Sequence, residues 1–435
     1  MTNALPRRIG HLALAVSIGA GACASAEEAP AAPAKWSDTL AFSAQLEIGG
    51  GIDSDTGPSG RIFGRLFDDK SNQVQLNQAM LTATRPLDPA ATDYDFGFKL
   101  QGFYGSDARY TRFTKQFVSL TNQDMNQFDL VEANLQVHLP APGEGGLDLK
   151  IGQYSTPIGA ETIDPSGNYF YSHSYIFNFA DPLKHSGFLA SWHLVTGVDV
   201  YGGLDTGINT NFDNFPNHAQ NSGPPAFIAG LGLSFFDGNL SFLGLTHIGT
   251  EIPNAAIANG LLPKTVSPSG NYRKIWDLVT TWKVDDSLTL INEANWIHDD
   301  ALNNGAAAEA YGMAQYATYA LDETLSLVAR GEIFVDSQNA FVGQFGNNAD
   351  FMRSEEGYPA LSAYTVTGGK LGQRSIYGAV TLGVNWKPVL PIPHLSSLTI
   401  RPEIRADGVL NGGTPFNDGK DRQQTTLSVD AILAF

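Results

Sequence analysis

The 435-residue sequence has a single cysteine, Cys23, so no disulfide within the chain can stabilise the fold. Outside the N-terminal segment it has no apolar run of the ~18 residues that a membrane helix needs, which excludes a helical membrane protein. Basic residues are few, 26 against 44 acidic ones, so the basic surface of a nucleic-acid-binding protein is missing. The nine histidines form no HExxH pair, and no P-loop or dinucleotide-binding glycine pattern occurs. We therefore expect no metal site, no cofactor and no nucleic-acid partner.

What the chain does have is an alternation of apolar and polar residues with a period of two, which predicts β-strands. Abundant glycine (46 residues) and an aromatic content of 11% are typical of a β-rich protein. The clearest alternating segments are 42–48, 78–84, 94–101, 131–139, 147–151, 188–194, 325–336, 398–407 and 426–435. In the last of these, Leu427, Val429 and Phe435 fall on the apolar face, whereas Ser428 and Asp430 fall on the polar one.

The connections between the predicted strands alternate in length. Seven are short: 85–93, 140–146, 195–197, 237–238, 285–286, 321–323 and 388–396. Eight are longer: 53–73, 106–126, 156–186, 208–224, 250–273, 299–307, 337–374 and 410–423. A soluble β-sandwich has no reason to sort its loops in this way, whereas a transmembrane barrel has short periplasmic turns and long extracellular loops. We predict an all-β fold, a transmembrane antiparallel β-barrel of about 16 strands, with fourteen or eighteen as the alternatives.

The N-terminus predicts export to the bacterial outer membrane. Arg7 and Arg8 precede an apolar stretch that ends in Ala24-Ser25-Ala26, the pattern of a secretory signal peptide cleaved after Ala26. A lipidated Cys23 is the less favoured alternative. We therefore divide the chain into a signal peptide (1–26), a short disordered periplasmic lead-in (27–39) and the barrel (40–435).

Aromatic residues and the C-terminal strand give the expected partners. Several aromatics are placed near predicted strand ends, as in the girdles at membrane interfaces: Tyr104, Trp192, Trp282, Trp296, Trp386 and Phe435. A final strand ending in Phe435 resembles the C-terminal signature of outer-membrane barrels, which implies contact with outer-membrane lipid and with the barrel assembly machinery. The last strand should pair with the first, around 42–48, to close the barrel.

One long stretch carries a family resemblance. Residues 152–187 read GQYSTPIGAETIDPSGNYFYSHSYIFNFADPLKHSG, in which a strand end leads through Thr156-Pro157 and Ser172-His173-Ser174-Tyr175 to Pro182, His185 and Gly187. Two later pieces match as well, Arg330-Gly331-Glu332 through Asp336 and Arg401-Pro402-Glu403-Ile404-Arg405 with Asp407. Together they resemble the OmpL-like β-barrel porin family. The resemblance implies an outer-membrane pore and leaves its solute open.

The resembling stretch occupies the third long connection, which in diffusion porins folds inward and narrows the channel. By that analogy the loop would contribute Glu161, Asp164, Asp181, Lys184 and His185 to a constriction. The opposite wall would contribute Arg330, Glu332, Arg401, Glu403 and Arg405. Facing acids and bases would set ion preference. The alternative is that these charges pair with one another and only stiffen the barrel.

We expect passive diffusion of small hydrophilic solutes or ions, with mild cation preference from the net charge of −18, and no enzymatic activity. A homotrimer is expected only by analogy with diffusion porins. One alternative is a plugged structural or adhesive barrel. A barrel hydrolase built on Ser172, His173, His185 and Asp181 is the remaining alternative, because these residues are close in sequence.

Overall fold

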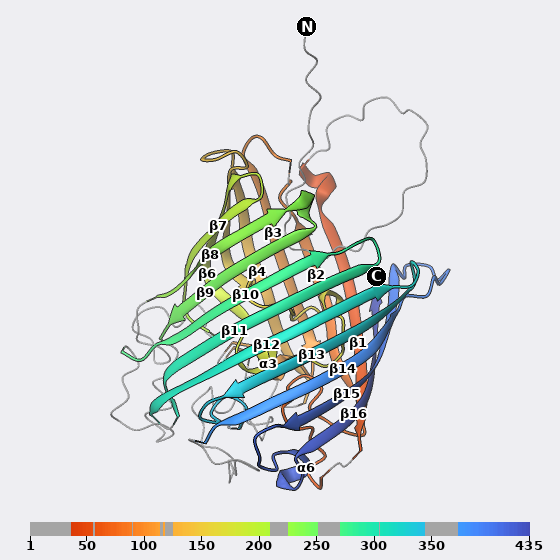
Figure 1. The fold of residues 1–435 in the computed structure, drawn as a ribbon. Helices are drawn as coiled ribbons and strands as arrows, with labels where there is room; N and C mark the ends of the chain where they lie inside the picture. The colour runs from red at the N-terminus through yellow and green to blue at the C-terminus, as the bar shows by residue number, and fades with distance from the viewer. Residues whose placement is uncertain are drawn as a thin grey trace.

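Sixteen antiparallel strands form one closed barrel (Figure 1) in the computed structural model. The structure describes residues 36–54, 57–88, 90–113, 116–117, 125–208, 225–250, 270–303, 305–343 and 373–435. The strands are β1 (Ala41–Asp53), β2 (Gln73–Arg85), β3 (Asp95–Gly105), β4 (Gln127–Leu139), β5 (Leu147–Ser155), β6 (Lys184–Val195), β7 (Val198–Asp205), β8 (Ala226–Phe235), β9 (Leu240–Gly249), β10 (Arg273–Lys283), β11 (Leu288–Asn303), β12 (Ala306–Ala320), β13 (Leu325–Asp336), β14 (Ser375–Trp386), β15 (Ser397–Val409) and β16 (Gln423–Ala434). The short helical elements are η1 (Trp36–Thr39), α1 (Ala108–Thr111), η2 (Pro165–Gly167), α3 (Tyr175–Phe179), η4 (Phe236–Gly238) and α6 (Phe416–Gly419).

The first and last strands close the barrel. Each strand pairs with its sequence neighbours, and β1 pairs with β16 in a register that runs from Gln45 opposite Ala434 to Asp53 opposite Thr426. The Phe435 N–H donates to the Ala44 carbonyl at 2.9 Å, so the ladder extends to the last residue. The predicted fold class, the strand number and the pairing of the termini are confirmed.

The outer wall is apolar and the inner wall is polar, the reverse of a soluble β-protein. On β16, Leu427 and Val429 are 50% and 46% exposed, whereas Thr426 and Asp430 are 0% and 2% exposed. Alternating side chains face lipid and lumen in a transmembrane barrel, which explains why hydropathy never peaks along the sequence. No helix in the described part of the chain is long and apolar enough to cross a membrane.

One predicted long loop is wrong. The expected loop over 299–307 is a hairpin in which β11 and β12 are joined by residues 304–305, with Asn303 opposite Ala306. Gly305 adopts φ +89°, a conformation that glycine reaches without strain and that a tight turn requires. The polar run before this glycine extends the strands through an irregular register after Asp299. The other predicted long and short connections lie between the strands as expected, except that the third long loop ends at residue 183. Lys184 and His185, predicted on that loop, are the first residues of β6, because ladder pairing with Ser155 and Tyr154 of β5 extends the strand to them.

The predicted signal peptide and most of the lead-in fall outside the described residues. Residues 1–35 are not described, and residues 36–39 form η1. The cleavage after Ala26 and the disorder of 27–39 therefore stay predictions.

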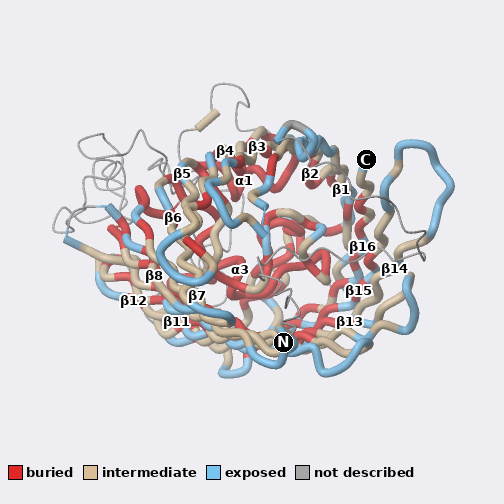
Figure 2. The backbone as a smooth tube through the Cα atoms, turned by 90° about the horizontal axis from the view of Figure 1, so that it is seen from above, coloured by how far each residue is buried: buried red, intermediate tan, exposed pale blue. Residues whose placement is uncertain are grey.

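The interior of the barrel is occupied by its own loops. Viewed along the barrel, α1 and α3 lie inside the ring of strands, surrounded by buried chain (Figure 2). We call three connections L1 (54–72), L2 (106–126) and L3 (156–183). Their described residues supply much of the buried apolar cluster, including Phe63, Phe67, Tyr110, Tyr175 and Phe177. The inner face of the barrel wall is polar. The apolar core inside the barrel is therefore built largely by side chains of the loops.

Candidate functional site

L3 folds into the barrel as two capped turns. The Asp164 carboxylate accepts the Ser166 N–H at 3.0 Å and caps η2, and the Ser174 hydroxyl accepts the Phe177 N–H at 3.1 Å and caps α3. Such caps satisfy backbone donors at the start of a helix and so allow helical turns as short as these. All five residues of α3 are buried. L3 is therefore an ordered insertion in the lumen.

Aromatic side chains hold α3 against L1 and the wall. Phe177 meets Phe67 of L1 edge-on, with ring centroids 5.4 Å apart. Tyr175 stacks on Tyr377 of β14 at 5.4 Å and on Phe334 of β13 at 6.2 Å. Offset and edge-on arrangements are the favourable ones for aromatic pairs. They place L3 on the side of the lumen formed by β13 and β14.

Glu161 is the acid by which L3 binds the wall. Its carboxylate accepts hydrogen bonds from Arg330 (2.7 Å), the Tyr316 hydroxyl (2.9 Å) and the Ser174 N–H (3.0 Å), and it contacts His173 Nδ1 at 2.8 Å. Burial disfavours its ionised form, but Arg330 and these hydrogen bonds outweigh burial and lower the pKa of Glu161 to about 2. Glu161 is therefore an ionised, buried anchor.

The charged residues of β13 and β15 bind the backbone of L3. Glu403 accepts the N–H groups of Tyr171 (3.0 Å) and Ser172 (3.2 Å), and Glu332 accepts that of Tyr175 (2.7 Å). Peptide groups of an irregular buried segment need such partners, because they make no ladder of their own. The acids on this wall thus satisfy loop amides.

The arginines of the same wall satisfy loop carbonyls. Arg330 donates to the Ser172 carbonyl at 2.8 Å, and Arg405 donates to the His173 carbonyl at 2.6 Å. Arg401 donates to the carbonyls of Pro165 (2.9 Å) and Asn168 (2.7 Å). Each arginine also has a carboxylate partner on the wall, so the charges are paired among themselves and with L3.

A second contact joins L3 to β10 and β11 around three acids, with no basic side chain among the partners described below. Asp181, Asp277 and Glu293 bring carboxylate oxygens within 4.8 Å of one another, and Asn295 donates to Asp181 (3.0 Å) and Asp277 (3.1 Å). The Ala160 N–H donates to Glu293 at 3.1 Å. Burial, followed by the neighbouring Asp277, raises the pKa of Asp181 well above its ordinary range.

The remaining predicted residues lie apart from this wall. Lys184 is fully buried, donates to Asp129 and to the Leu130 carbonyl, and lies over the ring of Phe113. His185 is fully buried and contacts Thr156 Oγ1 at 2.9 Å. Of the ten predicted constriction residues, only Asp164 and Asp181 are half-buried, and the other eight are buried.

Comparison with known proteins decides the family. The model of the family described as putative beta-barrel porin-2, OmpL-like, matches residues 39–435. The chain belongs to this family. No curated protein matches. Membership confirms the resemblance seen in the sequence and makes the chain an OmpL-like β-barrel porin of the outer membrane.

Solved porins share the fold of this OmpL-like chain at low sequence identity. The anion-selective porin of Comamonas acidovorans has a TM-score of 0.56 and 10% identity, covering 91% of this chain and 99% of its own. OmpF of Salmonella typhi, in complex with daunomycin, gives 0.53 and 9%, covering 91% and 97%. OmpT of Vibrio cholerae, in its trimer form, gives 0.52 and 13%, covering 91% and 99%. At such identities the likeness concerns the fold alone.

The residues of the hydrolase alternative have other partners in this porin. The Ser172 hydroxyl accepts from Arg330 at 3.1 Å, whereas the His173 ring contacts Glu161 and stacks on Phe177 with centroids 4.0 Å apart. Nucleophilic catalysis needs a base within hydrogen-bond reach of the nucleophile. Between Ser172 and the histidines of the described chain there is no such hydrogen bond.

Sequence reasoning missed the part that L1 plays. Arg65 is fully buried and forms ion pairs with Asp68 (2.7 Å) and with Asp407 of β15 (2.6 Å). The Asp69 carboxylate accepts two hydrogen bonds from the guanidinium group of Arg109 of L2, at 2.7 and 3.1 Å. The burial of L1 could have been predicted from the run Ile62-Phe63-Gly64-Arg65-Leu66-Phe67, because it is too apolar for a loop exposed to water.

Proposed function

We propose that this porin lets small hydrophilic solutes or ions diffuse passively across the outer membrane, through a lumen narrowed by L3. The observation that carries the proposal is the position of L3, which lies inside a closed sixteen-stranded barrel and is bound to β13 and β15. A barrel of this strand number is wide enough for an aqueous lumen, unlike an eight-stranded barrel filled by side chains.

The inner wall toward the short turns supports a wet path. Polar inward-facing side chains there stay half-buried or exposed, in contrast to the buried ones around L3: Ser43, Thr82, Gln136, Ser191, Thr281, Thr318 and Ser326. Small hydroxyl and amide side chains suit a water-filled passage, because they offer hydrogen bonds without fixed charge.

We propose that eight of the ten predicted residues divide into two roles in this passage. The buried Glu161, Arg330, Glu332, Arg401, Glu403 and Arg405 hold L3 in place, whereas Asp164 and Asp181, which are half-buried, face permeating ions. Lys184 and His185 are buried in contacts elsewhere in the interior. Asp164 precedes the first residue of η2, and its carboxylate accepts hydrogen bonds from the side-chain amides of Gln45 (3.0 Å) and Gln101 (3.4 Å). A fixed carboxylate at a narrow point favours cations.

Planar-bilayer recording tests the pore. Purified protein should give stepwise conductance, with a reversal potential in a salt gradient that indicates cation preference. Asp164→Asn should move that potential toward anions, whereas Glu323→Gln, an equivalent loss of charge at an exposed turn, should leave it unchanged. If both Asp164→Asn and Asp181→Asn leave the reversal potential at the wild-type value, the assignment of L3 to the constriction is wrong.

A plugged structural barrel is the second candidate. The observation that favours it is the buried apolar cluster that L1, L2 and L3 build inside the barrel. Absence of any conductance step from protein that migrates as a folded barrel would establish this candidate in place of the pore.

We also propose a homotrimer. Asn292 donates to Gln315 at 3.3 Å on the outer wall, where alternation places Gln315 on the same face as the exposed Met313 and Tyr311. An amide pair facing lipid is costly, so its position favours protein contact over β11 and β12. Native mass measurement in detergent should give three chains, and Gln315→Arg should give fewer. A wild-type mass of one chain would refute the trimer.

A further inference from the structure

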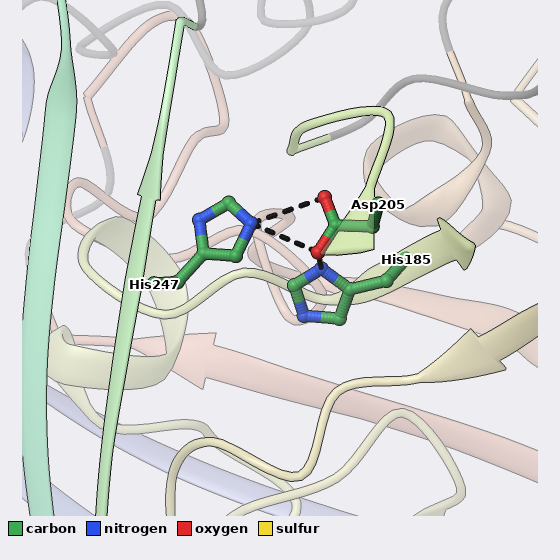
Figure 3. Close-up of side chains that lie close together, drawn as sticks. All are labelled: His185, Asp205 and His247. Carbon is green, nitrogen blue, oxygen red and sulfur yellow. Dashed lines mark hydrogen bonds and ion pairs between the residues drawn. The ribbon is translucent and has the colours of Figure 1, made fainter. Parts of the chain in front are cut away.

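Two histidines and an aspartate from three strands meet beside the point where the first and last residues of L3 come together, which we call the neck of L3. His185 of β6, Asp205 of β7 and His247 of β9 point toward one another (Figure 3). Asp205 Oδ2 lies 3.2 Å from His185 Nδ1 and 3.1 Å from His247 Nε2. All three side chains are 0% exposed. We call this group the His-Asp-His cluster.

The contacts around the His-Asp-His cluster orient its members. His185 Nε2 lies 2.9 Å from Thr156 Oγ1, and the tautomer that donates this hydrogen bond leaves a lone pair on Nδ1. That Nδ1 faces the Asp205 carboxylate at 3.2 Å, without the geometry of a directed hydrogen bond to any described residue. Asp205 Oδ1 accepts the Gly207 N–H at 2.7 Å, which fixes the carboxylate. In that tautomer the imidazole donates its Nε2–H outward to Thr156, and the carboxylate of Asp205 is itself hydrogen-bonded; both features are usual around the ligands of a metal ion.

The two His–Asp distances are close to those of a metal coordination sphere, and the ligand atoms of the three residues all lie within 4.8 Å of one another. Ligands 2.0–2.1 Å from a tetrahedral Zn²⁺ ion lie ~3.3 Å apart. The measured 3.1 and 3.2 Å are close to that edge. A second His/Asp group near the short turns is different, because its acids are partly exposed and each histidine has an aspartate at 2.6 Å: His138 contacts Asp148 and His193 contacts Asp199, with a longer His193–Asp148 contact of 3.2 Å beside them. Those contacts have the length of strong, charge-assisted hydrogen bonds.

We propose that His185, Asp205 and His247 bind a divalent transition-metal ion, with a fourth position left to water. Two imidazole nitrogens select zinc and its neighbours over calcium and magnesium, which prefer oxygen. The Tyr154 hydroxyl is buried beside His185 (ring centroids 5.6 Å apart) and has no hydrogen-bond partner among the described residues, so it adds a polar group next to the cluster.

Bound metal would fasten the neck of L3 to the wall. The Thr156 N–H donates to the Leu183 carbonyl at 3.1 Å, so the first and last residues of L3 meet beside the cluster. An ion held by β6, β7 and β9 would cross-link three strands at this point. Because the ligands are buried, we expect the ion to enter while the barrel folds.

Refolding with metal tests the proposal. Protein refolded with Zn²⁺ and then dialysed should retain one zinc ion per chain, and its thermal unfolding midpoint should exceed that of protein refolded with a chelator. Refolding with Co²⁺ should give the ligand-field absorption of a nitrogen-containing, low-coordinate site. Excess Ca²⁺ should not reduce the zinc content. Displacement by Ca²⁺ would overturn the proposal and assign the ion to the all-oxygen group of Asp181, Asp277 and Glu293.

Matched variants locate the ion. His247→Gln and His185→Gln should each lower zinc affinity at least ~10-fold, which is the smallest loss usual even for residues outside the ligand set. His193→Gln, in the group near the short turns, should change nothing. If the ligand variants fail to fold, Thr156→Val keeps all three ligands and should still weaken zinc binding. Equal zinc retention by wild type and either ligand variant, or by wild type and Thr156→Val, would refute the site.

Discussion

Glu161→Gln should release L3 from the wall while the barrel stays closed. Glutamine has the size of glutamate, but its amide nitrogen must take the place of one carboxylate oxygen. On one side that nitrogen would face Arg330, and on the other it would face the Ser174 N–H. Both are obligate donors, so either orientation of the amide sets donor against donor in a buried site.

The free energy lost in Glu161→Gln can be worked out in two ways. A Glu161 pKa of about 2 in place of the ordinary 4.5 corresponds to ~3 kcal/mol in favour of the folded, ionised state. Removing one partner of a buried ion pair costs ~3–5 kcal/mol by comparison with other proteins. Since the folded-state pKa is lowered, this stabilisation is complete above pH ~4.5 and is lost as the pH falls toward 2.

Hydrogen exchange followed by mass spectrometry measures the effect where it occurs. A loss of ~3 kcal/mol should speed exchange of the α3 amides about 100-fold at pH 7, because 1.4 kcal/mol corresponds to a factor of ten. The sixteen strand ladders should exchange as in the wild type. Glu323→Gln removes an exposed acid and serves as the control. Unchanged protection of α3 in Glu161→Gln would refute the view that this carboxylate anchors L3.

Two further substitutions test the acid group and the outer wall. Asp181→Asn should raise the free energy of unfolding at pH 7 by about 1 kcal/mol, seen as a higher denaturant midpoint, because its amide can donate to the neighbouring carboxylates, whereas the acid repels them. Since the pKa of Asp181 is raised, this gain should disappear below pH ~4, and a lower midpoint at pH 7 would contradict the reasoning. Val429→Arg, at the middle of the outer face of β16, should cost about 2–4 kcal/mol, and Thr425→Arg, near the strand end, about 1 kcal/mol or less. Equal losses would show that the membrane is not centred on β16.

The barrel could be predicted because its evidence is local. Period-two alternation on β16 already shows which side chains face lipid, and the loop lengths fix which ends of the strands lie together. From those two facts, the pairing of the last strand with the first follows, whereas the register that places Leu46 opposite Leu433 required the structure. The hairpin at Gly305 was missed because a polar run before a glycine reads equally as a loop or as two strands and a tight turn.

The interior could not be predicted, because alternation says only that a side chain faces inward. Arg65 meets Asp407 across 342 positions of sequence, and nothing near either residue indicates the other. The His-Asp-His cluster could not be predicted for the same reason. Its three residues follow no motif spacing, and they meet only because β6, β7 and β9 curve around the lumen. The alternation along the wall strands could predict that Arg330, Arg401 and Arg405 face inward, whereas their partners required the fold.

The three stretches that carry the family resemblance are two sides of one contact. The L3 stretch supplies backbone amides, carbonyls and Glu161, and the two wall pieces supply the Arg330 and Arg405 guanidinium groups that bind them. The motif therefore encodes where L3 is held, and an OmpL-like sequence can be expected to place this loop in the same way. It does not encode what passes beside the loop, because the side chains of that network are buried against one another and do not face a permeating solute. Selectivity is therefore expected from half-buried groups such as Asp164. There a substitution that keeps the cap of η2, such as Asp164→Asn, should change permeation without loosening L3.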